Sequence, residues 1–349
     1  MDAVLFFHTG LLNVQAFTGT YGINYGRIAD NIPPPESVVT LLKASKIKNV
    51  RIYDADHSVL TAFKGSGLEL DISISEDRAM SWLKENVQAF LPDTHIRELQ
   101  EALLGACKNI YDALDKLQLT DLIQVSTAHS EAVFANSYPP SSCTFKEEVI
   151  QYIMPLLQFF FTSRIAPSTS MLTLFWHTRA IQNILTLNML YLSRTLEYMT
   201  QKTDLHYDNM FDAQIDAAYA ALEALGFEKM EVRVSETGWA SDGDKDEAGA
   251  SVENARTYNY NLRKRLFKRK GTPLRPKMVV KAYVFALFNE NLKPGPASER
   301  HYGLFKADGS IAYDIGFSGL SPSSASALHL SIKVNASEIL IIIFYLKSF

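Results

Sequence analysis

Residues 20–53 have the sequence TYGINYGRIADNIPPPESVVTLLKASKIKNVRIY, in which two short apolar runs flank an amphipathic run. The runs at 22–26 and 50–53 are rich in β-branched and aromatic residues, which favours strands. Between them, residues 36–43 carry apolar side chains at helical spacing directly after three prolines, which is typical of the start of a helix. The stretch therefore predicts a strand, a crossover helix and a second, parallel strand.

The same alternation of strand and helix continues along the chain. Further strands are predicted at 68–74, 122–127, 230–235 and 279–288, and helices at 59–64, 76–91, 101–117, 145–161, 211–225 and 254–269. This order predicts an α/β fold with a parallel sheet, and over this length it suits a (β/α)8 TIM barrel. Because no long flexible linker interrupts it, we expect one barrel domain over residues 20–317.

Two intervals break the alternation. Residues 95–97 begin like a strand, but a helical run follows at once and leaves no room for a strand end and a loop. Residues 168–202 contain no Gly, Pro or Asp, and they show no clear strand or turn signal. We therefore expect the barrel to be incomplete at its fourth and sixth strands.

The composition narrows the classes of protein that this chain can belong to. Its 349 residues are 47% hydrophobic and 21% charged, which is typical of a globular protein with a sizeable core. The net charge of -4 gives no electrostatic reason to expect a nucleic acid partner. Two cysteines are too few for a disulfide scaffold or a four-cysteine zinc site. No run reaches the ~18 consecutive apolar residues of a membrane span.

The two ends of the chain resemble targeting signals. Residues 4–14 are apolar and precede Gln15 and Ala16, as in a secretory signal, although the basic start is missing. We interpret residues 1–19 as a degraded signal peptide, and an ordinary buried segment is the alternative. Residues 318–349 combine a Ser-rich linker with an apolar tail, the order of a glycolipid-anchor signal, although the tail is short. We expect a secreted protein whose membrane attachment, if any, is through such an anchor.

The search for catalytic motifs excludes several chemistries. None of the eight histidines lies in an HExxH motif or another metal-ligand spacing, and the chain has no GxSxG or GxxxxGK sequence. We therefore expect no metal and no cofactor. Carboxylates at the ends of predicted strands remain, and the carboxyl ends of the strands are where a barrel of this kind assembles its active site.

Glu236 is the best placed of these carboxylates. It ends the buried strand pattern of residues 232–235 and is followed closely by Trp239. Aromatic rings stack on the apolar faces of sugars while carboxylates bind their hydroxyl groups, so this pair predicts a glycan site. A salt bridge at the barrel rim is the alternative interpretation of Glu236.

A second group of candidates lies along the last predicted strand and its end. Strand alternation places Lys281 on one face, and Glu290 follows in the sequence Phe-Asn-Glu-Asn of residues 288–291. A lysine near a carboxylate favours its ionised form, although a structural ion pair is the alternative. Tyr25 and Tyr53 close the first two strands and are further candidates for substrate binding. Each tyrosine taken alone is more typical of a packed aromatic than of a ligand.

Several blocks together resemble the plant endo-1,3-β-glucanases of glycoside hydrolase family 17. They are GINYG at 22–26, RIYD at 51–54, SYPPS at 137–141, VSETGW at 234–239, FNEN at 288–291 and HYGLF at 301–305. The resemblance covers about residues 20–317. It implies a (β/α)8 barrel with an open glycan cleft, and retaining hydrolysis of internal β-1,3-glucosidic bonds of cell-wall glucans.

The resemblance also assigns roles to residues and a setting to the protein. Glu236 matches the family's nucleophile. Lys281 and Glu290 match charged residues that line the site, and Tyr53 and Trp239 match aromatics near the cleft. It further implies a secreted monomer of the cell wall with a role in plant defence.

The chain departs from the family pattern in two places. Retaining hydrolysis needs two carboxyl groups about 5–5.5 Å apart, and the family's acid/base glutamate lies in a Gly-Asn-Glu motif at the end of the fourth strand. This chain has no such motif, and Glu98-Leu99-Gln100-Glu101 follow Arg97 where it is expected. For the sixth strand, a shifted reading frame over about residues 168–201 would restore the family-like sequence NAYPF.

These departures lead us to expect impaired hydrolysis. Two alternatives remain open: a non-catalytic wall protein that binds β-glucan, and a defective copy without function.

Overall fold

The computed structural model describes residues 19–54, 56–72, 104–105, 107–108, 111–112, 115–116, 125–162, 171–175, 198–199 and 205–317, the backbone alone at 171–175 and 198–199. Residues 1–18 of the signal peptide predicted at 1–19, the helix at 76–91 and the tail at 318–349 lie outside the described residues. So do residues 95–101, where the family's acid/base motif is expected.

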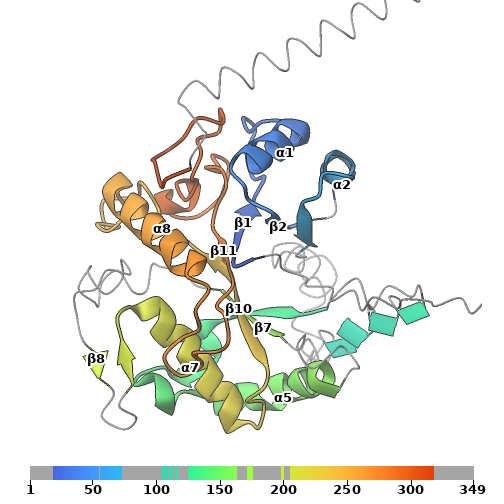
Figure 1. Cartoon of the computed structure of the whole chain (residues 1–349), viewed down its shortest axis with the longest axis vertical. Helices are drawn as coiled ribbons and strands as arrows, with labels where there is room; N and C mark the ends of the chain where they lie inside the picture. The colour runs from blue at the N-terminus through green and yellow to red at the C-terminus, as the bar shows by residue number, and fades with distance from the viewer. Residues whose placement is uncertain are drawn as a thin grey trace, which may run out of the picture.

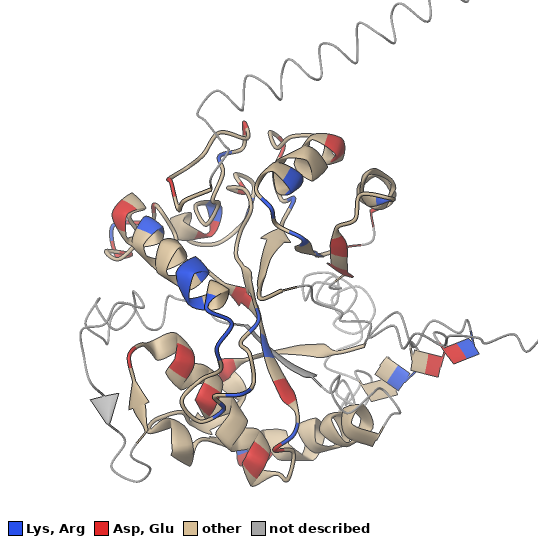
Figure 2. Ribbon diagram, viewed as in Figure 1, with Lys and Arg blue, Asp and Glu red and all other residues tan. Residues whose placement is uncertain are grey.

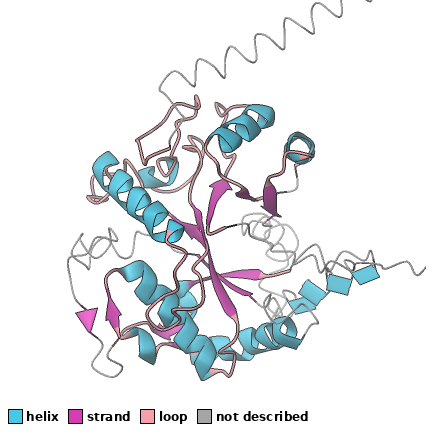
Figure 3. Cartoon of the chain, in the orientation of Figure 1, coloured by secondary structure: helices cyan, strands magenta, loops and turns pink. Residues whose placement is uncertain are grey.

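In the part of the chain that the structure describes, seven parallel strands form the central sheet, with the helices around it (Figure 3). The strands are β1 (Tyr21–Tyr25), β2 (Asn49–Ile52), β3 (Glu69–Ile72), β4 (Thr127–Ser130), β7 (Met171–Phe175), β10 (Glu231–Thr237) and β11 (Ala282–Val284). Their order is β3-β2-β1-β11-β10-β7-β4, so the first strand of the chain pairs with the last one, with Tyr21 opposite Ala282. Pairing of the first and last strands is the arrangement by which a sheet closes into a barrel.

A strand occupies the sixth place of this order. The backbone of β7 pairs with β10 on one side and with β4 on the other. We expected no strand in this segment, and for residues 171–175 that expectation is wrong, because their apolar run extends between two existing strands. The predicted incompleteness at the fourth strand falls between β3 and β4, where residues 73–103 lie outside the described residues.

The long helices begin and end within two residues of their predicted bounds. They are α1 (Pro35–Ala44), α2 (His57–Phe63), α5 (Glu147–Thr162), α7 (Met210–Ala224) and α8 (Val252–Phe267) (Figure 1). Side-chain caps define several starts, since Asp56, Asn209 and Ser251 each accept a hydrogen bond from a backbone N–H of the first turn. Among the described helices, none is both long and apolar enough to cross a membrane.

Short strands and 3-10 helices occur in addition to the central sheet and the α-helices. The short strands β5 and β6 pair with each other, as do β8 and β9. Their bounds, with those of three short 3-10 helices, are β5 (Phe134–Asn136), β6 (Thr144–Phe145), β8 (Tyr198–Met199), β9 (His206–Tyr207), η2 (Glu131–Val133), η3 (Pro140–Ser142) and η5 (Ala297–Arg300).

The core lies between the strands and the surrounding helices. Ile23 of β1, Val50 of β2 and Val234 of β10 are buried against helix residues such as Leu42 of α1 and Leu262 of α8. Full burial of such aliphatic side chains contributes about 1.5–3 kcal/mol each, which is the main force that fixes the strand positions. The ends of β1, β2, β10 and β11 are thereby held next to one another.

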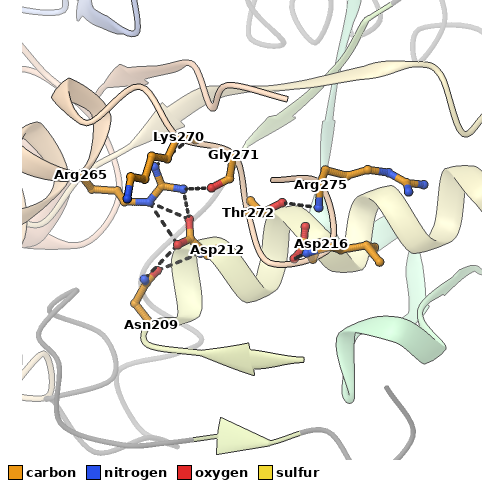
Figure 4. Close-up of polar contacts among 9 residues, drawn as sticks. Asn209, Asp212, Asp216, Arg265, Lys270, Gly271, Thr272 and Arg275 are labelled. Atoms are coloured by element: carbon orange, nitrogen blue, oxygen red, sulfur yellow. Dashed lines mark hydrogen bonds and ion pairs between the residues drawn. The ribbon is translucent and has the colours of Figure 1, made fainter. Parts of the chain in front are cut away.

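A cluster of polar contacts connects α7 and α8 to residues 270–275, which precede β11 (Figure 4). Arg265 of α8 donates through Nη2 to Asp212 of α7 at 2.9 Å and to the carbonyl of Gly271 at 2.7 Å. The backbone N–H of Leu274 donates to Asp216 Oδ2 at 2.8 Å. Asp216 is fully buried, and that burial raises its pKa to about 6. Because this segment precedes β11, the cluster lies at the amino end of the strand.

Candidate active site

Glu236 lies at the carboxyl end of β10, next to an irregularity of the sheet. Val234 pairs with Ala282, but the next registered pair is Thr237 with Val284, so β10 carries a bulge between them. A bulge redirects the side chains around it, and here it precedes the turn at which the strand ends. The side chain of Glu236 is 12% exposed.

Two donors from β2 and its end hold one oxygen of Glu236. Arg51 Nη1 lies 3.1 Å and the Tyr53 hydroxyl 2.8 Å from Glu236 Oε1. The same Arg51 nitrogen donates to the carbonyl of Ser235 at 3.0 Å, and the guanidinium lies over the Tyr53 ring. The carboxylate is therefore fixed through Oε1 by an ion pair and a neutral hydrogen bond.

Glu290 is a second buried carboxylate at this end of the barrel, 3% exposed. Its Oε1 accepts a hydrogen bond of 2.9 Å from the backbone N–H of Ile28, in the loop after β1. A Cβ atom at Gly26 would lie 2.3 Å from the same oxygen, so only glycine leaves room for this carboxylate. The end of β1 and the loop after β11 thus form one rim.

Lys293 and Glu299 complete the charged group, and the motif search missed both. Lys293 Nζ lies 3.0 Å from Glu299 Oε2 and 4.1 Å from the centroid of the Phe285 ring. Lys293 stands two residues after the FNEN block and Glu299 two residues before HYGLF. Extending the search to the flanks of these two blocks would have found them.

The charged side chains of the site influence one another's protonation. Burial raises the pKa of Glu236, and Glu290 adds to the rise, whereas Arg51, the Tyr53 hydrogen bond and Lys293 oppose it. Burial likewise raises the pKa of Glu290, against the opposing effects of Lys293 and the Ile28 N–H. The positive groups thus favour the ionised form of a carboxyl that burial alone would protonate.

Tyr53 stays neutral in this setting. Burial is the largest cause of a pKa well above the ordinary value of tyrosine, and the charge of Glu236 acts in the same direction. The phenol therefore remains a hydrogen-bond donor to the carboxylate, as the contact with Oε1 requires.

Of the residues predicted for the site, the structure brings Tyr53 and Glu290 to Glu236 and places two aromatics in the core. Tyr25 is 1% exposed and packs against Phe63 and Phe288. Trp239 is fully buried, and its indole N–H donates to the carbonyl of Gly249 at 2.8 Å. Neither ring presents a face on which a sugar could stack.

Lys281 lies at the opposite end of the barrel. It immediately precedes β11, and its Nζ is 3.0 Å from Oε1 of Glu231, the first residue of β10. Strand alternation predicts on which face of the strand the Lys281 side chain lies, but it does not predict at which end of the barrel axis. The lysine near the catalytic candidates is Lys293 instead.

Charged residues also occur along β10 itself, as Figure 2 shows for the central strands. Arg233 Nε donates to Glu231 Oε1 at 2.9 Å, beside the contact of that oxygen with Lys281. Across the part of the chain that the structure describes, no three His, Cys, Asp or Glu side chains are placed to hold a metal ion. The buried carboxyl groups of Glu236 and Glu290 can act as a nucleophile or as a proton donor or acceptor.

Comparison with known proteins agrees with this chemistry. Residues 21–317 match the model of the family described as glycosyl hydrolases family 17. Glucan endo-1,3-beta-glucosidase 14 of Arabidopsis thaliana is 41% identical over 326 residues, which cover 86% of this chain and 83% of that protein. For glucan endo-1,3-beta-glucosidase 11 of the same plant the identity is 39% over 334 residues, or 88% and 78% of the two chains.

A solved structure is similar over most of the chain. It is a beta-1,3-glucanase and allergen of Cryptomeria japonica pollen, with a TM-score of 0.73 and 33% sequence identity. The match covers 86% of this chain and 99% of the other.

Proposed function

The chain belongs to glycosyl hydrolases family 17, and we propose that it hydrolyses internal β-1,3-glucosidic bonds of glucans with retention of configuration. The family resemblance and the (β/α)8 barrel expected from the sequence are confirmed. The observation that carries the proposal is the placement of Glu236 at the carboxyl end of β10, with Arg51 and Tyr53 on one carboxylate oxygen. That is the position and the protonation control that a glycosidase nucleophile needs.

In the proposed first step, a Glu236 oxygen bonds to the anomeric carbon while the bond from that carbon to the leaving oxygen breaks. Because Arg51 and Tyr53 both occupy Oε1, the attacking atom is Oε2. The leaving oxygen takes a proton from a second carboxyl group, which then removes a proton from the water that releases the sugar. Lys293 supports the step by favouring the ionised nucleophile.

The second carboxyl group is where this chain departs from its family. The sequence has no Gly-Asn-Glu motif, so we propose weak turnover on natural glucan. Loss of general acid catalysis commonly costs a factor of ~10²–10⁴. A substrate whose leaving group needs no proton does not suffer this loss in the first step, whereas hydrolysis of the glycosyl-enzyme still lacks its base and is slow.

The proposal is tested with two substrates, laminarin and 2,4-dinitrophenyl β-laminaribioside. We expect release of dinitrophenolate, with far slower release of reducing ends from laminarin. Both activities should vanish in Glu236→Gln, which keeps the shape of the side chain but cannot attack. Absence of dinitrophenolate release from a folded wild-type chain would refute the proposed nucleophile.

A non-catalytic glucan-binding protein is the second candidate, and the missing acid/base motif is the observation that favours it. Binding of laminarin without release of product from either substrate would support this candidate. Such binding should then survive Glu236→Gln.

We further propose that the chain is a secreted, monomeric cell-wall protein with a role in plant defence. The apolar run at residues 4–14 supports secretion. The Ser-rich and apolar residues of 318–349 support attachment through a glycolipid anchor.

A further inference from the structure

Glu247, in the loop after β10, holds the short helix η5 that carries Glu299. Its carboxylate is buried, and Oε2 accepts hydrogen bonds from the backbone N–H groups of Asp244 at 2.9 Å and Ser298 at 3.1 Å. The Ser298 hydroxyl lies 2.5 Å from the other oxygen. A single side chain therefore fixes both the backbone and the hydroxyl of the residue that precedes Glu299.

Further contacts join the same two segments. The backbone N–H of Ala297 donates to Asp244 Oδ2 at 2.9 Å. At the other end of η5, the backbone N–H and the hydroxyl of Ser241 both reach the carbonyl of His301, at 2.8 and 2.9 Å. The loop after β10 is consequently hydrogen-bonded to residues on both sides of Glu299.

The loop packs tightly around the Glu247 side chain. A Cβ atom at Gly243 would lie 2.9 Å from Glu247 Oε2 and 2.8 Å from the Cβ of Ala250. Such close approach leaves little freedom for the carboxylate to change its partners. The contacts to Ser298 are thus part of a rigid arrangement.

The position of Glu299 determines that of Lys293. Their side chains form an ion pair of 3.0 Å, and the guanidinium of Arg300 donates to the carbonyl of Lys293 at 3.3 Å. Lys293 in turn favours the ionised forms of Glu236 and Glu290. A continuous set of contacts therefore runs from Glu247 to the two carboxylates of the site.

We propose that Glu247 is a positioning residue for hydrolysis: through Ser298 it places the Glu299–Lys293 ion pair beside the nucleophile. The inference rests on the function proposed above and names a residue that does not itself touch substrate.

The hydrogen bonds that the Glu247 carboxylate accepts determine which substitution disrupts the arrangement. Glu247→Ala removes the acceptor of the Asp244 and Ser298 N–H groups, and because Ser298 is buried the loop must shift. Glu247→Gln keeps one oxygen for these N–H groups, while its amide can donate to the Ser298 hydroxyl oxygen. Gln should therefore largely rescue what Ala disturbs.

Titration of Glu236 measures the effect without requiring turnover. In protein labelled with carbon-13 at the glutamate carboxyl groups, the resonance that disappears in Glu236→Gln identifies this residue. The groups that face it are Arg51 and Tyr53 from β2 and its end, and Glu290 and Lys293 from the loop after β11. Of these groups, Lys293 contacts η5 directly, through Glu299 and Arg300.

We expect Glu247→Ala to raise the pKa of Glu236 by about 0.5 unit, the size expected when one screened charge moves a few ångström. Glu247→Gln should stay near the wild-type value, and Ser298→Ala, which removes one hydrogen bond, should lie between them. Asp216→Ala is the matched control, because Asp216 also binds a loop N–H with a buried carboxylate, at the other end of the barrel. It should leave the titration of Glu236 unchanged.

The outcomes separate this inference from the proposed function. An unchanged titration in folded Glu247→Ala would overturn the inference even if the wild type hydrolyses its substrate. If the pKa of Glu236 also shifts in Asp216→Ala, the inference is overturned as well, because destabilising a distant part of the barrel would then have the same effect as Glu247→Ala. If Glu247→Ala does not fold, the shift in Ser298→Ala decides. Absence of dinitrophenolate release by the wild type would refute the proposed function. A shift of the Glu236 pKa that occurs in the Glu247 and Ser298 variants but not in Asp216→Ala would still establish the positioning role of Glu247.

Discussion

Replacing Asp216 by Asn should stabilise the protein at high pH but not at low pH. Burial raises the pKa of Asp216 from the usual 3.8 to about 6 in the folded chain, against the opposing effect of the hydrogen bond from the Leu274 N–H. A folded pKa above the unfolded one means that the folded state holds its proton more tightly. The stability associated with this carboxyl is therefore complete below about pH 4 and is lost as the pH rises through 6.

The pKa values set the size of the effect. The difference of about 2.2 units, at about 1.4 kcal/mol per unit, amounts to about 3 kcal/mol of unfolding free energy at pH 8. Asn carries no charge at any pH, and its amide oxygen can accept the Leu274 N–H bond that Asp216 accepts now. The advantage of Asp216→Asn over wild type should accordingly grow by up to about 3 kcal/mol between pH 4 and pH 8.

Urea unfolding followed by circular dichroism at pH 4, 6 and 8 measures this difference. Both proteins should show the same dependence of unfolding free energy on urea, so that the midpoints report stability directly. If the difference between Asp216→Asn and wild type is constant from pH 4 to pH 8, the buried carboxyl does not titrate as described and the reasoning fails.

Two further predictions concern the candidate site. Tyr53→Phe removes the hydroxyl that donates to Glu236 Oε1 and lowers the pKa of Glu236. The acid limb of the pH profile of dinitrophenolate release should therefore move to higher pH, by about 0.5–1 unit for one hydrogen bond. If the acid limb and the rate are both unchanged in Tyr53→Phe, the hydrogen bond between Tyr53 and Glu236 does not act as described. Gly26→Ala puts a methyl group where the Glu290 carboxylate lies, so it should lower both the melting temperature and the rate of release, and a variant with wild-type values would show that Glu290 lies elsewhere.

Helix positions were predictable because periodicity and capping act locally. The bounds of α7, for example, follow from apolar spacing and from Asn209, which accepts a hydrogen bond from the N–H of Asp212 at the start of the helix. Strand bounds were less predictable, because a strand extends only as far as its neighbours do. β11 is confined to Ala282–Val284 although its apolar sequence runs on, and β7 forms in a segment without a strand signal of its own.

The site was predicted in part for similar reasons. Glu236 ends a strongly patterned strand, so its place at the carboxyl end of β10 follows from sequence. For Lys281 the pattern indicates a side of the strand but not an end of the barrel. Burial of Trp239 depends on the loop that folds over it, as the hydrogen bond to Gly249 shows, and no local pattern reports such a contact.

The pairing of β1 with β11 has a consequence for synthesis of the protein on the ribosome. Arg51 and Glu236 are separated by 185 positions, and Ile28 and Glu290 by 262. An emerging chain cannot bring these partners together until nearly all of it has been translated, and contacts between such distant positions form slowly. A product of premature termination before η5 should therefore have no partial activity, and its unpaired β1 edge would be a target for chaperones and proteases.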